Sequence, residues 1–456
     1  MANRIISRAV LAAALTGTAA SSLAQTPGKA SDFDARLFDS PALATPYRDN
    51  LSDDEKVAGL SKFWSEVKYN FVYVDKLKQL DWDRLYLEYL PKVRATASTA
   101  EYYRVLAELC AKLQDGHTNV YAPAQLDDET MARPLLSTWL VEDRVLLRQV
   151  FDPALIKQGL APGVEIVAVD GEPARAYAGR VLAPGVSAST PQDLDNRIYG
   201  LEFLMGSLKD AAPRLTLRDA AGNTFERAVP RASWERFVAA RGRAEPFELR
   251  MLPGNVAYVA LNSFRDDRAA DAFLAAFDRI KGASALVIDV RANSGGNSSV
   301  GYRVLQTLAD KPFQPGKWAT RQYLPAYRAW QRPLPDHEQV GEARAPDPAH
   351  HFGKPVAVLT SGATYSAAED FAVAFDAMRR GILVGGATGG STGQPLKVAL
   401  PGGGIARICT KADTYADGRR WVGKGIAPDV VATPTVSDVR QGRDTVLETA
   451  LVHLRK

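Results

Sequence analysis

The sequence predicts a multi-domain α/β protein with a helical N-terminal region, a β-rich module and an α/β core. Three patterns support this fold class. Apolar residues recur at helical spacing within residues 51–125, and short strands separated by turn residues follow within 131–232. Apolar strands then alternate with helices over 250–440, and 441–456 is predicted as a C-terminal helix.

The N-terminal segment differs in kind from the rest of the chain. Arg4 and Arg8 precede an apolar run, and small residues then lead to Ala24. This order is typical of a secretory signal peptide over residues 1–24, so we expect cleavage near Ala24 and a periplasmic or secreted protein. A membrane anchor is the alternative, but the run is too short to span about 30 Å of hydrocarbon. Residues 25–50 are predicted to form a loose leader.

The helical region and the β-rich module show clear boundary signals. Ser52 is followed by three acidic residues, which is typical of a capped helix start. The last helix of the region ends near the turn Asp115-Gly116-His117-Thr118. Within the next module, residues 159–173 form a strand flanked by Pro-Gly and Asp-Gly, a pattern typical of β structure.

The core contains two apolar strands that each lead through a turn into a helix. The strand at 286–290 precedes a Gly-rich loop, and the strand at 356–360 precedes a helix that begins near Ser366. Residues 311–353 interrupt this pattern and are rich in Pro, Trp and Tyr. We interpret them as a surface insertion or lid.

Composition excludes several classes of function. The formal net charge is +4 and no basic run occurs, so a nucleic-acid surface is not expected. After the N-terminus no apolar segment approaches 18 residues, so the mature form is not expected to enter a membrane. The two cysteines, Cys110 and Cys409, could pair or remain buried thiols. Zinc-ligand spacing is absent, and neither a metal nor a cofactor is predicted.

Ser366 is the candidate nucleophile. It stands where an apolar strand ends and a helix begins, and ligands of α/β sheets bind at the carboxyl ends of strands. The backbone amide of Ala367 would then point at an oxyanion formed on attack. The alternative is structural, because Ser366 and Glu369 also match a capping box in which the serine only satisfies helix amides.

The loop after the first core strand offers further amide donors. Gly295 and Gly296 allow the backbone to approach a ligand closely, so either amide could complete an oxyanion hole. The alternative is a turn chosen only for its backbone angles. A phosphate-binding loop is a weaker interpretation, because no Gly-Lys-Ser/Thr follows.

His117 is the candidate general base. A serine hydroxyl needs a base to become an effective nucleophile, and histidine has a suitable pKa. His117 alone lies in a tight turn, although a loop histidine is often structural. The chain's other histidines lie in the insertion or the C-terminal helix, namely His337, His350, His351 and His453.

The motifs occur in an order that resembles the family of tail-specific (C-terminal processing) proteases and its tricorn-core relatives. They are residues 113–118, 159–173, 289–296, 364–369 and 425–429. The resemblance covers nearly the whole mature chain and implies a PDZ-like domain at 131–232 and a crotonase-like catalytic core. It also implies that Ser366 is the nucleophile and that Ala367 with Gly295 or Gly296 supplies the oxyanion amides.

The identity of the base departs from one branch of this family. Proteases of the Ser-Lys type carry a lysine about 25 residues after the serine, a position that is Ser391 here. Lys397, Lys411 and Lys424 remain as displaced candidates.

The tricorn-like branch uses an early histidine, which corresponds to His117. Its usual orienting partners are missing, since Gly116 and Val422-Gly423 stand in their places. Asp115 could substitute, so the third catalytic member stays open.

We therefore predict a serine endopeptidase that acts on exported or unfolded proteins or their C-terminal tails. The PDZ-like domain would capture peptide by strand addition, or would only shape the cleft. One alternative is a catalytically inactive peptide-binding protein of the same fold, as the absent lysine and missing histidine partners suggest. Hydrolysis of an ester or lipid is a third interpretation that fits the same Ser-His chemistry.

Overall fold

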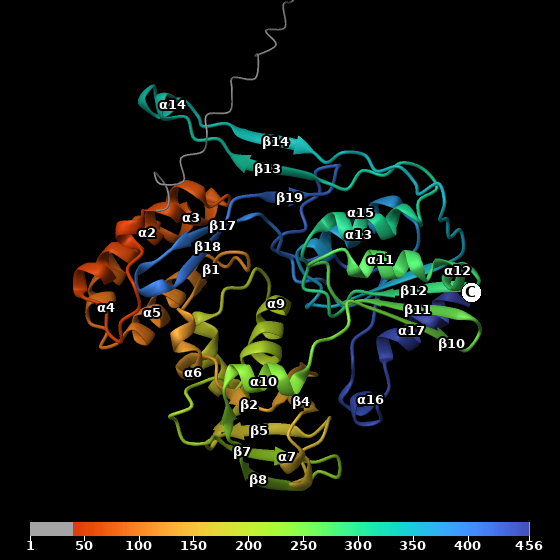
Figure 1. Ribbon diagram of the computed structural model, residues 1–456, viewed down its shortest axis with the longest axis horizontal. Coiled ribbons are helices and arrows are strands. Elements are labelled where there is room, and N and C mark those ends of the chain that lie inside the picture. Colours follow the sequence, from red (N-terminus) through yellow and green to blue (C-terminus); the bar gives the residue numbers. More distant parts are fainter. Residues whose placement is uncertain (1–39, 456) are drawn as a thin grey trace, which may run out of the picture. The chain divides into compact units, whose positions relative to one another are not determined.

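The computed structural model describes residues 40–455 (Figure 1). The predicted signal peptide and residues 25–39 of the predicted leader lie outside this range. The described part confirms the predicted fold class, because it combines several helices and sheets around separate cores. Within residues 40–455, every helix is too short or too polar to cross a membrane.

The helical N-terminal region begins at a well-formed cap. Ser52 accepts from the Glu55 amide at 3.3 Å, and the Glu55 carboxylate accepts from the Ser52 amide at 2.9 Å. This reciprocal pair satisfies two otherwise unpaired helix donors. The region contains η1 (Pro41–Leu43), α2 (Asp53–Asn70), α3 (Val74–Leu80), α4 (Trp82–Arg94) and α5 (Thr99–Ala111).

A three-stranded antiparallel sheet packs on these helices, although two of its strands come from the far end of the sequence. Its order is β1 (Asn119–Tyr121), β18 (Ile405–Cys409) and β17 (Pro395–Ala399). Ala406 and Ile408 are buried in the same hydrophobic cluster as Leu106 of α5. Residues 395–409, which the sequence analysis assigned to the 250–440 core, therefore pack with the helical region.

The β-rich module is an antiparallel sheet that follows the predicted pattern of short strands and turns. Whether it acts as a PDZ domain stays a prediction. Its strands are β3 (Leu136–Val141), β4 (Arg144–Val150), β5 (Glu165–Val169), β7 (Arg214–Arg218) and β8 (Thr224–Ala228), with β6 (Glu172–Pro173) on β5.

Short elements surround this sheet. A small antiparallel ladder pairs β2 (Arg133–Pro134) with β9 (Arg231–Ala232), so the beginning and the end of the module's chain segment lie together. The helical pieces are η2 (Ala124–Leu126), α6 (Asp127–Thr130), α7 (Pro153–Lys157), α8 (Ala174–Tyr177), η3 (Ala178–Leu182), η4 (Ala183–Gly185), α9 (Pro191–Asp195), η5 (Asn196–Glu202) and α10 (Trp234–Arg241).

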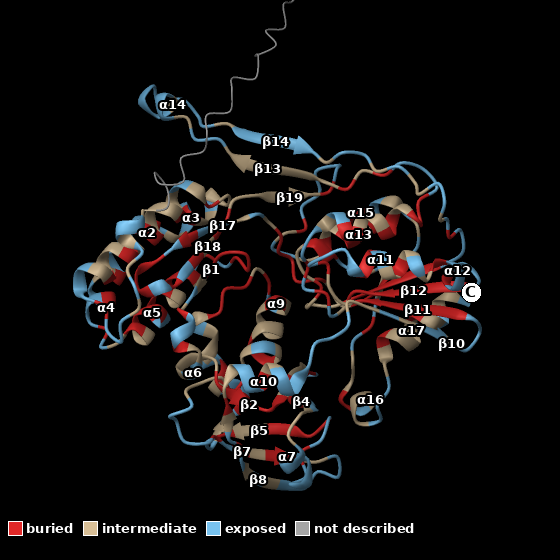
Figure 2. Cartoon of the chain, viewed as in Figure 1, coloured by how far each residue is buried: buried red, intermediate tan, exposed pale blue. Residues whose placement is uncertain are grey.

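The core is a six-stranded sheet whose strands are parallel except at one edge, where β10 is antiparallel to β11. The inner strands β11, β12 and β15 are buried along their whole length (Figure 2) and are near-continuous apolar runs, whereas the edge strand β10 is partly exposed. The order of the sheet is β10 (Phe247–Leu252), β11 (Val256–Leu261), β12 (Ala285–Asp289), β15 (Val356–Thr360), β16 (Ile382–Gly385) and β20 (Val430–Val431).

Helices cover both faces of this sheet (Figure 1). The core helices are α11 (Arg268–Ala275), α12 (Phe277–Lys281), α13 (Ser298–Gln306) and α15 (Ala367–Met378). The predicted C-terminal helix at 441–456 is observed as α17 (Thr445–Leu454), which packs on the face opposite α13 and α15. Two short helices lie outside the core: η6 (Pro401–Gly403) joins β17 to β18, and α16 (Val436–Arg440) packs on the β-rich module.

The 311–353 insertion is a hairpin whose outer strand is exposed along its whole length (Figure 2). Its inner strand pairs with β19 (Ala412–Thr414), which ties the hairpin to the core. The hairpin consists of β13 (Lys317–Arg321), α14 (Pro325–Ala329) and β14 (Asp336–Val340). The surface position fits the predicted insertion, and a lid function stays a prediction.

Candidate active site

Ser366 lies at the junction of β15 and α15 in an unusual backbone conformation. Its φ is 56° and its ψ is −125°, a region that non-glycine residues rarely adopt. Its amide donates to the Glu369 carboxylate and to the Ser391 carbonyl, both at 3.1 Å. These bonds hold the backbone that carries the Ser366 hydroxyl.

The structure brings His117 to this hydroxyl across 249 positions of sequence. The distance from His117 Nε2 to Ser366 Oγ is 3.0 Å, which is within hydrogen-bonding reach of a nucleophile and its base. The Tyr365 ring stacks on the imidazole at 4.9 Å between centroids and 2° between planes. The ring of His117 is therefore fixed in orientation before any substrate binds.

Ser391 contacts the other imidazole nitrogen, a role that the sequence analysis did not assign. Its Oγ lies 2.8 Å from His117 Nδ1. When Nδ1 carries the ring proton and donates to Ser391, Nε2 is free to accept the Ser366 proton. The only signal in the sequence was positional, since Ser391 stands where the Ser-Lys branch has its lysine.

Glu369 is buried beneath Ser366 and organises the loop that carries Ser391. Its carboxylate accepts from the Thr388 hydroxyl and from the amides of Gly390, Ser391 and Ser366, at 2.5–3.1 Å. Burial raises its pKa to about 8, although these four donors act in the opposite direction. Glu369 thus fixes the backbone of Ser366 and of the loop that carries Ser391, and it does not hydrogen-bond the imidazole.

Asp115 does not take the place of the missing histidine partner. Its Oδ2 accepts from the Thr118 hydroxyl at 2.5 Å, and its Oδ1 has no hydrogen-bond partner among residues 40–455. Burial raises the pKa of this carboxyl group. The side chain shapes the turn that presents His117, and Ser391 is the group that contacts Nδ1.

Two backbone amides near Ser366 are free to bind an oxyanion. Within residues 40–455, the amides of Ala367 and Gly296 donate to no other group, whereas the Gly295 amide donates to Asn293 Oδ1 at 2.9 Å. Gly295 has a φ of 97°, and a Cβ there would lie 2.7 Å from the Ser366 Cβ. Gly295 therefore allows the close approach, and Gly296 is the better second donor.

The catalytic cavity, as we call the space around Ser366 and His117, has a volume of about 390 Å³. Burial and, to a smaller extent, the nearby cations Arg407, Arg197 and Lys411 together lower the pKa of His117 to about 3. The imidazole is therefore neutral at physiological pH. The cavity is lined by Gly116, His117, Asn119, Tyr121, Arg197, Ser294, Gly296, Tyr365, Ser366, Gly393, Gln394, Pro395 and Arg407.

Comparison with known families agrees with this geometry. Residues 255–432 match the model of peptidase family S41, and residues 56–111 match the tricorn protease C1 domain. The chain therefore contains a peptidase family S41 domain, which supports its resemblance to the tail-specific proteases. This domain makes it a serine-type peptidase, and the S41 match contains Ser366, Ala367 and the Gly295-Gly296 loop.

Solved structures show the same fold over most of this chain. Mature CPAF in complex with lactacystin has a TM-score of 0.69 at 15% identity, covering 88% of this chain and 98% of its own. A second structure of mature CPAF has a TM-score of 0.67 at 16% identity, covering 89% and 96%. A putative peptidase from Parabacteroides merdae has a TM-score of 0.53 at 19% identity, covering 89% and 97%.

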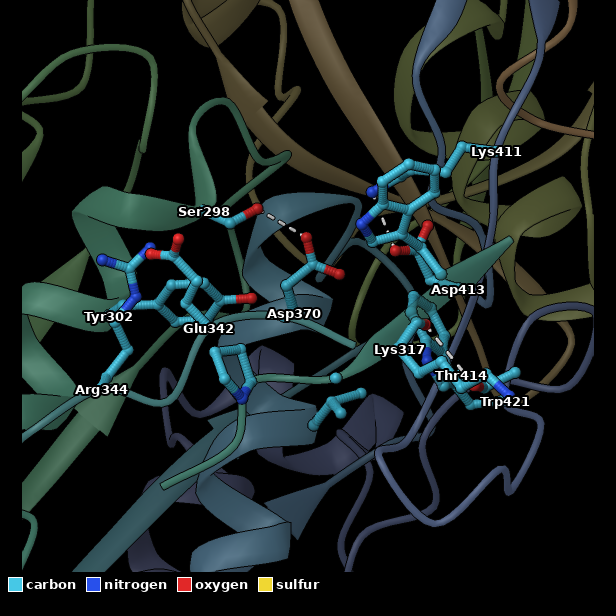
Figure 3. A pocket seen from close by; sticks show the side chains of 15 residues that line it. Ser298, Tyr302, Lys317, Glu342, Arg344, Asp370, Lys411, Asp413, Thr414 and Trp421 are labelled. Carbon is cyan, nitrogen blue, oxygen red and sulfur yellow. Dashed lines mark hydrogen bonds and ion pairs between the residues drawn. The ribbon is translucent and has the colours of Figure 1, made fainter. Parts of the chain in front are cut away.

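None of the displaced lysine candidates hydrogen-bonds the Ser366 hydroxyl, which among residues 40–455 bonds to His117. Lys397 and Lys424 are exposed. Lys411 lies in another cavity of about 190 Å³, which we call the lysine cavity (Figure 3). There its Nζ is 2.8 Å from Asp413.

The carboxylates of the lysine cavity keep Lys411 charged. Burial opposes the charge, but Asp413 and Asp370 outweigh it and raise the pKa of Lys411. Asp370 in turn accepts from the Ser298 hydroxyl at 2.6 Å, as Figure 3 shows. A lysine in this state is a poor proton acceptor. In residues 40–455, no three His, Cys, Asp or Glu side chains are arranged to share a metal ion.

Proposed function

We propose that this protein is an exported endopeptidase with Ser366 as nucleophile and His117 as general base. Its substrates would be exported or unfolded proteins or their C-terminal tails. The observation that carries the proposal is the 3.0 Å approach of a neutral imidazole to the Ser366 hydroxyl. Burial keeps that imidazole in the form that accepts a proton, with a pKa of about 3.

In the first step, Ser366 Oγ attacks the peptide carbonyl while His117 Nε2 takes its proton. The resulting imidazolium gives the proton to the leaving amine, and water then hydrolyses the acyl-enzyme by the same route in reverse. Ser391 accepts from Nδ1–H throughout and holds the ring in this tautomer. Because Ser391 carries no charge, it orients the imidazole but contributes less to imidazolium stability than a carboxylate would.

The amides of Ala367 and Gly296 are proposed to bind the tetrahedral oxyanion. Ala367 is the first residue of α15, so the positive end of the helix dipole adds to its effect. Both donors are fixed in the backbone and need no reorganisation when charge develops. Their free amides and the close packing of Gly295 against Ser366 support this assignment.

The β-rich module supports the proposed capture of peptides, and the N-terminal segment supports the proposed export. The antiparallel sheet over 136–228 is suited to peptide capture by strand addition if it acts as the predicted PDZ-like domain. The three-part pattern of residues 1–24 supports export to the periplasm or beyond.

The test is turnover of casein and of a tailed peptide by the purified protein and by Ser366→Ala. We expect Ser366→Ala to lose about 10⁴-fold or more in kcat, since only binding and the oxyanion donors would remain. Ser299→Ala is the matched control, because Ser299 is an exposed serine at the start of α13. A fluorophosphonate probe should label the wild type and Ser299→Ala but not Ser366→Ala.

Equal turnover by the wild type and Ser366→Ala would refute the mechanism. Absence of both turnover and labelling would favour the alternative of an inactive peptide-binding protein. Labelling of Ser366 with turnover of esters but of no peptide would favour the ester or lipid hydrolase.

A further inference from the structure

The sheet β1–β18–β17 places a row of polar side chains beside the catalytic serine. Arg407 on β18 lies directly opposite Asn119 on β1 and Lys397 on β17. Residues directly opposite in an antiparallel pair share one face of the sheet, and neighbours along a strand alternate. Since Ala406 and Ile408 are buried in the helical core, Arg407 projects from the other face, where it lines the catalytic cavity.

Positive charge is in excess among the residues that line the catalytic cavity. No aspartate or glutamate is among the residues that line the catalytic cavity, whereas two arginines are. Arg197 is paired with the buried Asp193 at 2.7 Å. Among residues 40–455, Arg407 donates only to the Tyr121 hydroxyl, at 3.3 Å, and no ion pair within that range includes Arg407 or Lys397.

Two like charges directly opposite each other in a sheet destabilise it unless an anion lies near them. A guanidinium group offers paired N–H donors that match the two oxygens of a carboxylate. The lining of the catalytic cavity therefore contains an arginine without an ion pair and no acid, and Lys397 lies across the strand from that arginine. These features together indicate a site for a carboxylate near the scissile bond.

We propose that Arg407 binds a carboxylate of the substrate and so makes this enzyme selective for acidic peptides. The proposal rests on the proposed function, because it assigns the substrate class of the same site. The carboxylate would be either an acidic side chain close to the scissile bond or the C-terminal group of the peptide.

A bound carboxylate would also compensate for a feature of the site that disfavours catalysis. Proton transfer to His117 creates an imidazolium beside Arg407, Arg197 and Lys411, all of which lower its pKa. Its Nδ1 faces the neutral hydroxyl of Ser391. A substrate carboxylate on Arg407 would offset part of this positive potential.

The test measures binding separately from catalysis. Fluorescence polarisation with the full-length Ser366→Ala protein would compare short labelled peptides that differ only in Glu or Gln, each with a free or amidated C-terminus. We expect a peptide with the correct carboxylate to bind about 10- to 100-fold more tightly, as for a hydrogen bond to a charged group. The Glu/Gln and acid/amide comparisons identify which carboxylate is bound.

Arg407→Gln in the same background is expected to abolish this preference, and Arg407→Lys to keep part of it, since it retains charge but not the planar fork. Arg236→Gln is the matched control, because it removes an equal charge from the exposed face of α10. Equal affinity for all peptides, or a preference that survives Arg407→Gln, would overturn the proposal.

Turnover of the same peptides by the protein with Ser366 intact separates the two proposals. Ser366-dependent turnover with no acidic preference refutes only the role of Arg407. An acidic preference in binding that depends on Arg407, without any turnover, refutes only the proposed peptidase function.

Discussion

The catalytic cavity lies at the residue before α15 and the lysine cavity is lined by α15 itself, yet the two cavities stabilise opposite charge states of their buried bases. In the catalytic cavity His117 is buried among cations and faces a neutral hydroxyl on Nδ1. In the lysine cavity Lys411 is buried among carboxylates, with Asp413 at 2.8 Å (Figure 3). Burial disfavours the charged form in both cavities, so the neighbouring charges decide the outcome.

This difference explains which group can act as a base. His117 is kept neutral and can accept a proton from Ser366, whereas Lys411 is kept protonated and cannot. The carboxyl groups of the lysine cavity are perturbed as well: burial and, after it, the neighbouring Asp370 raise the pKa of Asp413 to about 7. The catalytic cavity therefore holds a neutral histidine that can act as the base. The lysine cavity holds a charged lysine that is paired with a carboxylate.

The largest expected effect is that of replacing the base. His117→Gln should lower kcat/KM by about 10³- to 10⁴-fold, since general base catalysis is lost while the oxyanion donors remain. Steady-state kinetics on a peptide substrate measures this loss.

Lys411→Met is the counterpart in the lysine cavity and should cost less than about tenfold, because Lys411 does not contact the reacting atoms. Circular dichroism would establish that both variants fold. A folded Lys411→Met protein as inactive as His117→Gln would reverse the assignment of the base.

An intermediate effect is expected from the neutral partner of His117. Ser391→Ala removes the hydroxyl that accepts from Nδ1, and we expect a loss of about 10- to 100-fold in kcat with a smaller change in KM. Ser391→Thr retains the hydroxyl and should recover part of the rate. Wild-type kcat in Ser391→Ala would mean that Tyr365 stacking alone orients the ring.

The smallest effect is expected from pH. With a pKa of about 3, His117 stays neutral above pH 5, so kcat/KM should change by less than about twofold between pH 7 and pH 5. A histidine with the ordinary pKa of about 6.5 would instead lose about 25-fold over this interval. A pH–rate profile in constant ionic strength distinguishes the two, and an acid limb near pH 6.5 would contradict the neutral, buried base.

Local patterns were sufficient to predict several elements of this protein. The Ser52 cap, the strand–turn–helix unit that ends at Ser366 and the buried parallel strands are encoded within short segments. The sequence also singled out His117, because histidine is rare in the chain and only this one lies in a tight turn. Neither the angle nor the reach of its side chain could be deduced from that turn.

Residue patterns were enough to predict the fold class, the candidate nucleophile and a short list of bases. Three features appeared only in the folded protein: Ser391 contacts Nδ1, Gly296 rather than Gly295 has a free amide, and Arg407 faces the catalytic cavity without an ion pair. Each of them depends on packing between segments far apart in the chain, such as β18 against β1. Periodicity and local propensity carry no information about which distant groups share one buried, weakly screened environment.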